Sequence, residues 1–219
     1  MALKIQVIEA SNPDPQIIKE AARLISKGEV IVCPTDTGYA FATNALDSKA
    51  ITKVFTLKGR SYFNPIHVAV SSVEQAEKYA YVNKAAEYLA HRFLPGALTL
   101  VLSKKEIIPS LLVGGRQTVG VRIPDNKVIL DLADVTNLPL TATSANISGT
   151  ATPYTVQEIV NQLGNWMEQV ALVLDQGPLI PIGTSTVVDL TVTPPQIIRN
   201  GPVSEQDILE ALRLIQNSE

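Results

Sequence analysis

The sequence predicts an α/β fold in which helices flank a mixed sheet of parallel and antiparallel strands. Short β-type runs alternate with amphipathic segments along most of the chain. With 219 residues, 46% of them hydrophobic, the chain can bury a substantial core. No linker, internal repeat or low-complexity tract interrupts the pattern. We therefore expect a single domain over residues 1–219, with a core from about 12 to 202 and a C-terminal helix from about 204 to 216.

Each helix is expected where a polar cap precedes apolar residues spaced three or four apart. The expected caps are Asp14, Asp47, Ser71, Asn83, Asn126, Thr155 and Ser204. Each strand is expected where a short apolar run is bounded by Pro, Gly or polar residues. The expected strands cover residues 30–33, 66–70, 98–102, 118–123, 140–144, 172–175, 186–190 and 196–199.

The stretch from Val30 to Val70 predicts a ligand pocket. Its first strand stops at Pro34 and is followed by a hydroxyl-rich turn that begins with Thr35. A helix then leads into Lys58 and Arg60, which flank a glycine, and a second strand closes the unit. Strand, polar turn, helix, basic loop and strand commonly build a pocket for a small anion.

Each candidate residue also has an alternative explanation. Lys58 and Arg60 would suit phosphate binding, but cations also favour the C-terminal end of a helix, and both should be partly exposed there. Ser144 ends a strand, where open α/β sheets bind ligands, but it could belong to an ordinary turn. Arg122 lies inside an apolar strand and needs a carboxylate from the protein or from a ligand. It could also be a surface cation, as could Arg199.

Charge and motifs exclude several classes of protein. Residues 1–127 hold 16 Lys/Arg and 11 Asp/Glu, whereas residues 128–219 hold 2 and 10. The basic half could recruit an anionic ligand. There is no P-loop, dinucleotide-binding or GxSxG motif, and no Cys/His cluster typical of zinc. The single cysteine, Cys33, should be buried and structural. No signal peptide or membrane span is expected, which favours a soluble cytoplasmic protein.

Nine segments in this order resemble the YrdC-type threonylcarbamoyl-AMP synthase family of the single-domain, TsaC-like kind. These segments are PTDTGYAF (34–41), NALD (44–47), LKGR (57–60), NP (64–65), LPGALTLVL (94–102), TVGVRIP (118–124), TSANISG (143–149), TSTVVD (184–189) and IIRNGP (197–202). The resemblance implies a twisted mixed sheet with a concave, positive face. It also implies a nucleotidyltransferase that makes threonylcarbamoyl-AMP and pyrophosphate from L-threonine, bicarbonate and ATP. The product would serve a downstream threonylcarbamoyl transferase that modifies tRNA at position 37.

The resemblance also assigns residues. The ATP-facing residues would be Lys58, Arg60, Thr118, Asn146 and Arg199, with Lys58 and Arg60 catalytic. The threonine-facing residues would be Thr35, Arg122, Ser144 and Ser185. Mg²⁺ would accompany ATP, with no protein side chain as metal ligand. The family's pocket histidine aligns with Ala69, so we expect His67, two residues earlier, to be dispensable. Two alternatives stay open: a non-catalytic module that binds tRNA or double-stranded RNA on the concave face, and a carbamoyl-adenylate-forming paralogue.

Overall fold

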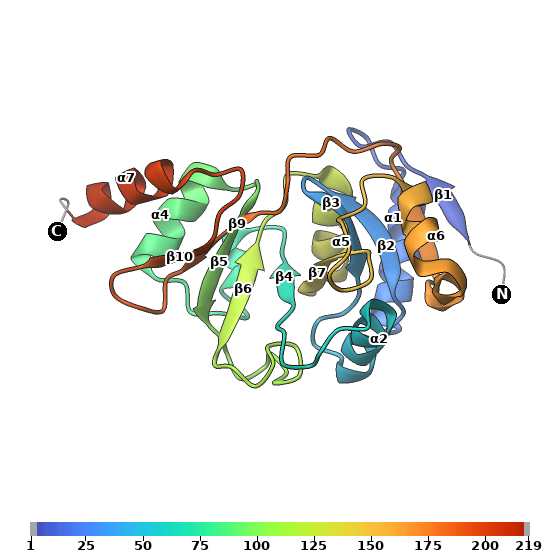
Figure 1. Cartoon of the computed structure of the whole chain (residues 1–219), viewed down its shortest axis with the longest axis horizontal. Helices are drawn as coiled ribbons and strands as arrows, with labels where there is room; N and C mark the ends of the chain where they lie inside the picture. Colours follow the sequence, from blue (N-terminus) through green and yellow to red (C-terminus); the bar gives the residue numbers. More distant parts are fainter. Residues whose placement is uncertain (1–3, 217–219) are drawn as a thin grey trace.

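A computed structural model describes residues 4–216 and places ten strands in one mixed sheet, in the order β1-β8-β2-β3-β7-β4-β6-β5-β9-β10 (Figure 1). The strands are β1 (Ile5–Val7), β2 (Ile31–Thr35), β3 (Gly38–Ala42), β4 (His67–Ala69), β5 (Leu98–Ser103), β6 (Thr118–Arg122), β7 (Leu140–Ser144), β8 (Leu172–Asp175), β9 (Thr186–Asp189) and β10 (Gln196–Arg199). The sheet combines parallel pairs, such as β4 with β6, with antiparallel pairs, such as β4 with β7. The predicted mixed α/β fold is confirmed.

The helices begin close to the predicted caps. They are α1 (Pro15–Ser26), α2 (Ser48–Lys58), α3 (Val73–Ala76), α4 (Lys84–Phe93), α5 (Lys127–Thr136), α6 (Val156–Leu163), the 3₁₀ helix η1 (Gly164–Gln169) and α7 (Glu205–Gln216). Asp14 and Asp47 accept hydrogen bonds from the first turns of α1 and α2, and Thr155 with Glu158 forms a complete capping box. For α3 the predicted cap is wrong by one residue, because Ser72 rather than Ser71 caps the helix.

Two strands, β1 and β3, were not predicted from the sequence. β1 is only three residues long and pairs with β8 alone. β3 follows β2 directly, and the two form an antiparallel hairpin that includes Pro34. The strand was expected to stop at this proline. Because β8 pairs only with Ile31 and Val32, the missing N–H of Pro34 breaks no bond between β2 and β8.

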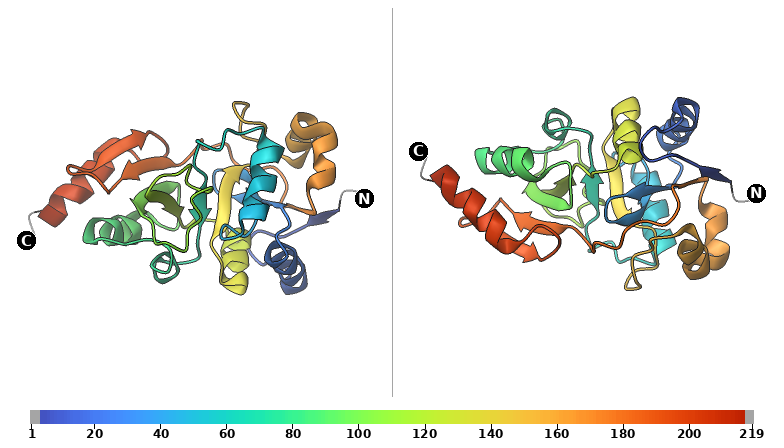
Figure 2. Two further views of the ribbon diagram at one scale, coloured as in Figure 1. Left: turned by 90° about the horizontal axis from the view of Figure 1, so that it is seen from below. Right: turned by 90° about the horizontal axis from the view of Figure 1, so that it is seen from above.

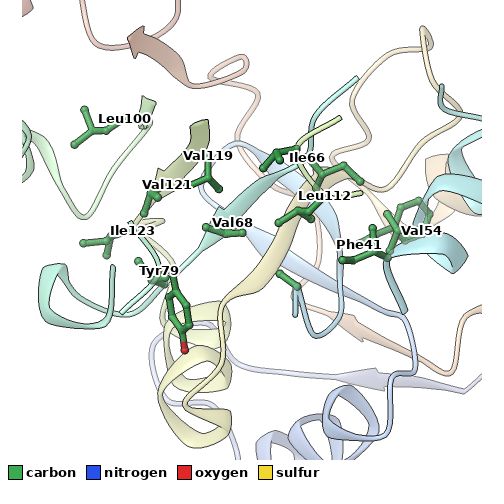
Figure 3. Close-up of a cluster of buried hydrophobic side chains, with 14 of the residues drawn as sticks. Phe41, Val54, Ile66, Val68, Tyr79, Leu100, Leu112, Val119, Val121 and Ile123 are labelled. Atoms are coloured by element: carbon green, nitrogen blue, oxygen red, sulfur yellow. The ribbon is translucent and has the colours of Figure 1, made fainter. Parts of the chain in front are cut away.

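The sheet separates two hydrophobic clusters. Figure 2 shows α1 and α5 on one side of the sheet and α2 and α6 on the other. The smaller cluster lies under α1 and α5 and includes Cys33 and Ala69. The larger one joins α2 and α6 to the strands and includes Phe41, Val68 and Val121 (Figure 3). Within residues 4–216, no helix combines the length and apolar character that crossing a bilayer requires.

Candidate active site

A cavity of about 240 Å³ lies over the central strands of the sheet. Its walls come from segments far apart in sequence: the β2–β3 hairpin, β4, the last residue of β6, the end of β7 and the loop after it, the end of β10, and the loops before β4 and β9. Its lining includes Thr35, Thr37, Tyr39, Ala40, Arg60, His67, Arg122, Thr143, Ser144, Thr152, Ser185 and Arg199. Six of the nine predicted site residues therefore meet in one cavity: Thr35, Arg60, Arg122, Ser144, Ser185 and Arg199.

Arg122 is anchored by the turn between β2 and β3. Its side chain is buried, and it donates from Nη2 to Asp36 Oδ1 at 2.6 Å and from Nη1 to Thr37 Oγ1 at 2.7 Å. Burial lowers the pKa of Arg122 and the charge of Asp36 opposes this, so the guanidinium stays charged. Arg122 Nε and Asp36 Oδ2 are buried without a hydrogen-bond partner in the described part of the chain. The prediction that this arginine needs a carboxylate is met by Asp36.

Two further guanidinium groups reach the cavity, Arg60 from the segment after α2 and Arg199 from the end of β10. Arg60 donates to the backbone carbonyls of Asn64 at 3.1 Å and Pro65 at 2.9 Å. Arg199 donates to the carbonyl and hydroxyl oxygens of Ser185, both at 2.9 Å. Each arginine is thus fixed by neutral acceptors, which leaves its positive charge uncompensated. An anionic ligand is what such a cavity attracts.

His67 lies in the cavity between these cations. Burial, together with the smaller effect of the charges of Arg199, Arg122 and Arg60, lowers the pKa of its imidazole to about 3. The ring is therefore neutral at physiological pH and can both donate and accept a hydrogen bond. The expectation that Ala69 occupies the pocket position is wrong. Ala69 lies two residues further along β4 and points to the same face of the sheet as His67. There it is buried in the smaller hydrophobic cluster, under α5.

Lys58 is buried rather than partly exposed, which corrects the sequence expectation. Only 1% of its surface is accessible. Its ammonium donates to Ser144 O at 2.5 Å, to Asn146 O at 3.1 Å and to Asn146 Oδ1 at 2.7 Å. Burial, with Arg60 nearby, lowers the pKa of Lys58 to about 7. Lys58 ends α2 just before Gly59, a position that looks exposed from local sequence, but the chain after β7 folds over it.

Asn146 and Thr118 also stand apart from the cavity lining. Asn146 accepts from Lys58 and from the Ser144 hydroxyl, and donates to the carbonyls of Thr150 and Ala151. It therefore ties the loop after β7 to α2. Thr118 begins β6 and shares a face with Arg122, because alternate residues of a strand point the same way.

The predicted hydroxyl groups are held by short hydrogen bonds. Thr35 Oγ1 donates to Gly38 O at 2.7 Å, and the hydroxyls of Ser185 and Thr99 lie 2.8 Å apart. Sequence reasoning missed Asp36 and Thr37, although both belong to the hydroxyl-rich turn that it identified. Within residues 4–216, no cluster of three or more His, Cys, Asp or Glu side chains is placed to hold a metal ion.

Comparison with known families agrees with this geometry. The Sua5/YciO/YrdC family model, described as telomere recombination, matches residues 23–201. The chain belongs to the Sua5/YciO/YrdC family. The predicted family resemblance is confirmed. A Pyrococcus abyssi member named threonylcarbamoyl-AMP synthase is 38% identical over 192 residues, which are 87% of this chain and 56% of that protein. A Methanocaldococcus jannaschii member is 35% identical over 95% of this chain and 99% of its own length.

Solved structures of the Sua5/YciO/YrdC family share the fold. Pyrococcus abyssi Sua5 complexed with L-threonine superposes with a TM-score of 0.89 at 36% identity, over 95% of this chain and 60% of that one. Escherichia coli YciO gives a TM-score of 0.82 at 27% identity, over 94% and 98% of the two chains. This chain thus spans a little over half of the Pyrococcus protein and nearly all of the shorter relatives.

Proposed function

We propose that this protein is an L-threonylcarbamoyladenylate synthase, which forms threonylcarbamoyl-AMP and pyrophosphate from L-threonine, bicarbonate and ATP. The observation that carries the proposal is the convergence of Arg60, Arg122 and Arg199 on a cavity with one neutral imidazole. A substrate set with a carboxylate, a carbonate and phosphates suits three cations. The names of the relatives and the L-threonine complex of the Pyrococcus abyssi protein give independent support.

The threonine end of the site would use Arg122 for the carboxylate. Arg122 is held rigidly by Asp36 and Thr37, so a bound carboxylate would meet a preorganised guanidinium. Neutral His67 would accept a hydrogen bond from the amino group, which a protonated imidazole would repel. The hydroxyls of Thr35, Ser144 and Ser185 would bind the remaining polar atoms of the amino acid.

The chemistry would proceed in two steps. The free amine of threonine attacks the carbon of bicarbonate and water leaves, which gives N-carboxythreonine. The new carboxylate then attacks the α-phosphate of ATP, a phosphorus–oxygen bond forms, and pyrophosphate leaves. Arg60 and Arg199 would stabilise charge on the phosphates, and Mg²⁺ would enter bound to ATP as part of the substrate. No nucleophilic side chain is needed, because the role of the protein is positioning and charge stabilisation.

Lys58, Asn146 and Thr118 would contribute to ATP binding from outside the cavity lining. Lys58 and Asn146 are hydrogen-bonded to each other, so a phosphate contact by either would share or replace these bonds. Thr118 would contact ATP from the start of β6. The product would pass, in the cytoplasm, to a threonylcarbamoyl transferase acting on tRNA.

The decisive assay is pyrophosphate release from ATP with L-threonine or bicarbonate omitted in turn. We expect release only when both are present, together with an AMP-linked product. Equal release without threonine, or with carbamoyl phosphate in place of bicarbonate and threonine, would contradict the synthase and favour a carbamoyl-adenylate enzyme. Salt-dependent binding of double-stranded RNA without any pyrophosphate release would favour the RNA-binding alternative.

A further inference from the structure

The imidazole of His67 is positioned by packing alone. In the described part of the chain no hydrogen bond or ion pair joins its ring nitrogens to another residue, and the charged groups around it are Arg60, Arg122 and Arg199. β4 runs parallel to β6, with Val68 opposite Val121, so His67 lies beside Gly120 on the same face of the sheet. The surface that the ring rests on is therefore the bare backbone of Gly120.

A side chain at position 120 would leave no room for this arrangement. A Cβ added to Gly120 would lie 2.5 Å from Cδ2, 2.9 Å from Cγ and 3.1 Å from Nε2 of the His67 ring. Distances under 3 Å are far inside van der Waals contact, so one of the two groups must move. The strand around Gly120 is paired on both sides, with β5 and with β4, whereas His67 borders an open cavity. The ring is the group that would move.

The need for glycine here is steric rather than conformational. Gly120 has no left-handed backbone angle, in contrast to Gly38 or Gly59. An alanine could adopt the backbone of β6 without strain, and its methyl group would meet only the imidazole among its nearest atoms. The absence of a side chain therefore has a specific effect, which is to hold open the space for His67.

We propose that Gly120 is a positioning residue for the synthase reaction, and that it fixes the imidazole of His67 against β6 in the orientation that binds the amino-acid substrate. The inference rests on the proposed function for its substrate and on the geometry for its mechanism. Gly120 would act through His67 alone, without touching the substrate itself.

The test is a double-mutant cycle of Gly120→Ala and His67→Ala. Gly120→Ala should raise KM for L-threonine by about tenfold or more, since a misplacement near 1 Å can have such an effect, and should leave KM for ATP within about twofold. In the His67→Ala background the added methyl group has space. There, Gly120→Ala should change neither KM nor the melting temperature. An equal penalty in both backgrounds would overturn the proposal.

A second measurement is independent of activity. The chain has two histidines, His67 and His91, so ring ¹⁵N signals can be assigned by comparison with His67→Ala. In the wild type the His67 signal should stay that of a neutral ring down to about pH 5, since its pKa is lowered to about 3. In Gly120→Ala the ring should leave the three guanidinium groups, so its tautomer signal and pKa should change. An unchanged His67 signal would show that the ring has not moved and would refute the mechanism.

These readouts separate the two proposals. If wild-type protein shows no threonine-dependent reaction, the proposed function fails, and the ¹⁵N experiment still decides whether Gly120 fixes the ring. If Gly120→Ala does not fold, the double variant Gly120→Ala/His67→Ala tests the steric contact instead. Recovery of folding in Gly120→Ala/His67→Ala supports the steric contact, and failure of both variants overturns it.

Discussion

Replacing Arg122 by methionine separates the structural role of this arginine from its role in binding. Arg122 and Asp36 form a buried ion pair, with Nη2 and Oδ1 2.6 Å apart and side chains 7% and 9% exposed. Methionine fills a similar volume without charge, so Asp36 would keep a buried carboxylate whose partner is gone. Its Oδ2 has no hydrogen bond even in the intact pair. The loss of one partner therefore leaves an uncompensated charge.

The expected loss of stability in Arg122→Met follows from the burial of the ion pair. Removing one member of a buried ion pair destabilises a protein by about 3–5 kcal/mol. For a chain of this size each kcal/mol lowers the melting temperature by about 2–4 °C, so Arg122→Met should melt roughly 6–20 °C below wild type. Arg122→Met/Asp36→Asn removes the stranded charge and should recover most of this loss. Lys127→Met is the matched control, because its 2.7 Å pair with Asp131 is exposed and should contribute less than about 1 kcal/mol.

Denaturant unfolding and threonine titration should be measured on the same variants. We expect the double variant to regain stability and to remain unable to bind L-threonine, because the guanidinium is missing in both. If Arg122→Met melts within about 2 °C of wild type, Asp36 does not carry an uncompensated buried charge in the variant. A double variant that is no more stable than Arg122→Met would refute the same point.

Three other side chains give sharp predictions. Lys58→Ala loses buried methylene groups and leaves Asn146 O without its donor, so it should lower the unfolding free energy by about 3 kcal/mol. The control Lys53→Ala, at a half-exposed lysine paired with Glu29, should lower it by less than about 1 kcal/mol. Equal losses would contradict the burial of Lys58. Burial raises the pKa of the Cys33 thiol to about 12, so thiol reagents should label it only after unfolding. Rapid labelling of native protein would refute this. His67→Gln should weaken threonine binding. The pKa of His67 in the folded protein is below its ordinary 6.5, so wild type should lose stability as pH falls from 6.5 toward 3. His67→Gln should lose less stability over the same range. Parallel stability curves for the two proteins would contradict the lowered pKa.

Local sequence was informative where a local rule decides the structure. The caps at Asp14 and Asp47 and the capping box at Thr155 bond the backbone within four residues, so a short window contains all the information. The need of Arg122 for a carboxylate was also predictable, because charge in an apolar strand requires compensation. That the carboxylate is Asp36 was not, since the two residues are 86 positions apart.

The features that local sequence did not predict depend on residues far away in the chain. Lys58 ends a helix before a glycine, which locally indicates exposure, yet the segment after β7 that buries it lies 86 and 88 positions later. The position of His67 in the cavity could not be read from local sequence, because Gly120 and the three arginines belong to other segments. Whether His67 is dispensable, as expected from sequence, stays a prediction. β3 was missed although four of its five residues are hydrophobic, because β2 was expected to end at Pro34 and only the polar turn was assigned after it. The nine-residue site assignment, like the single-domain boundaries, stays a prediction.

The strand order also has a consequence for how the chain reaches this structure. β8 lies between β1 and β2, so the first two strands of the chain are joined only by a strand some 140 residues later. β7 likewise separates β3 from β4. During synthesis, the edge strand β1 and the β2–β3 hairpin would leave the ribosome long before β7 and β8, with which they pair, have been made. Folding of this sheet is therefore dominated by non-local pairing, which is slow and leaves apolar strands such as β2 uncovered during synthesis.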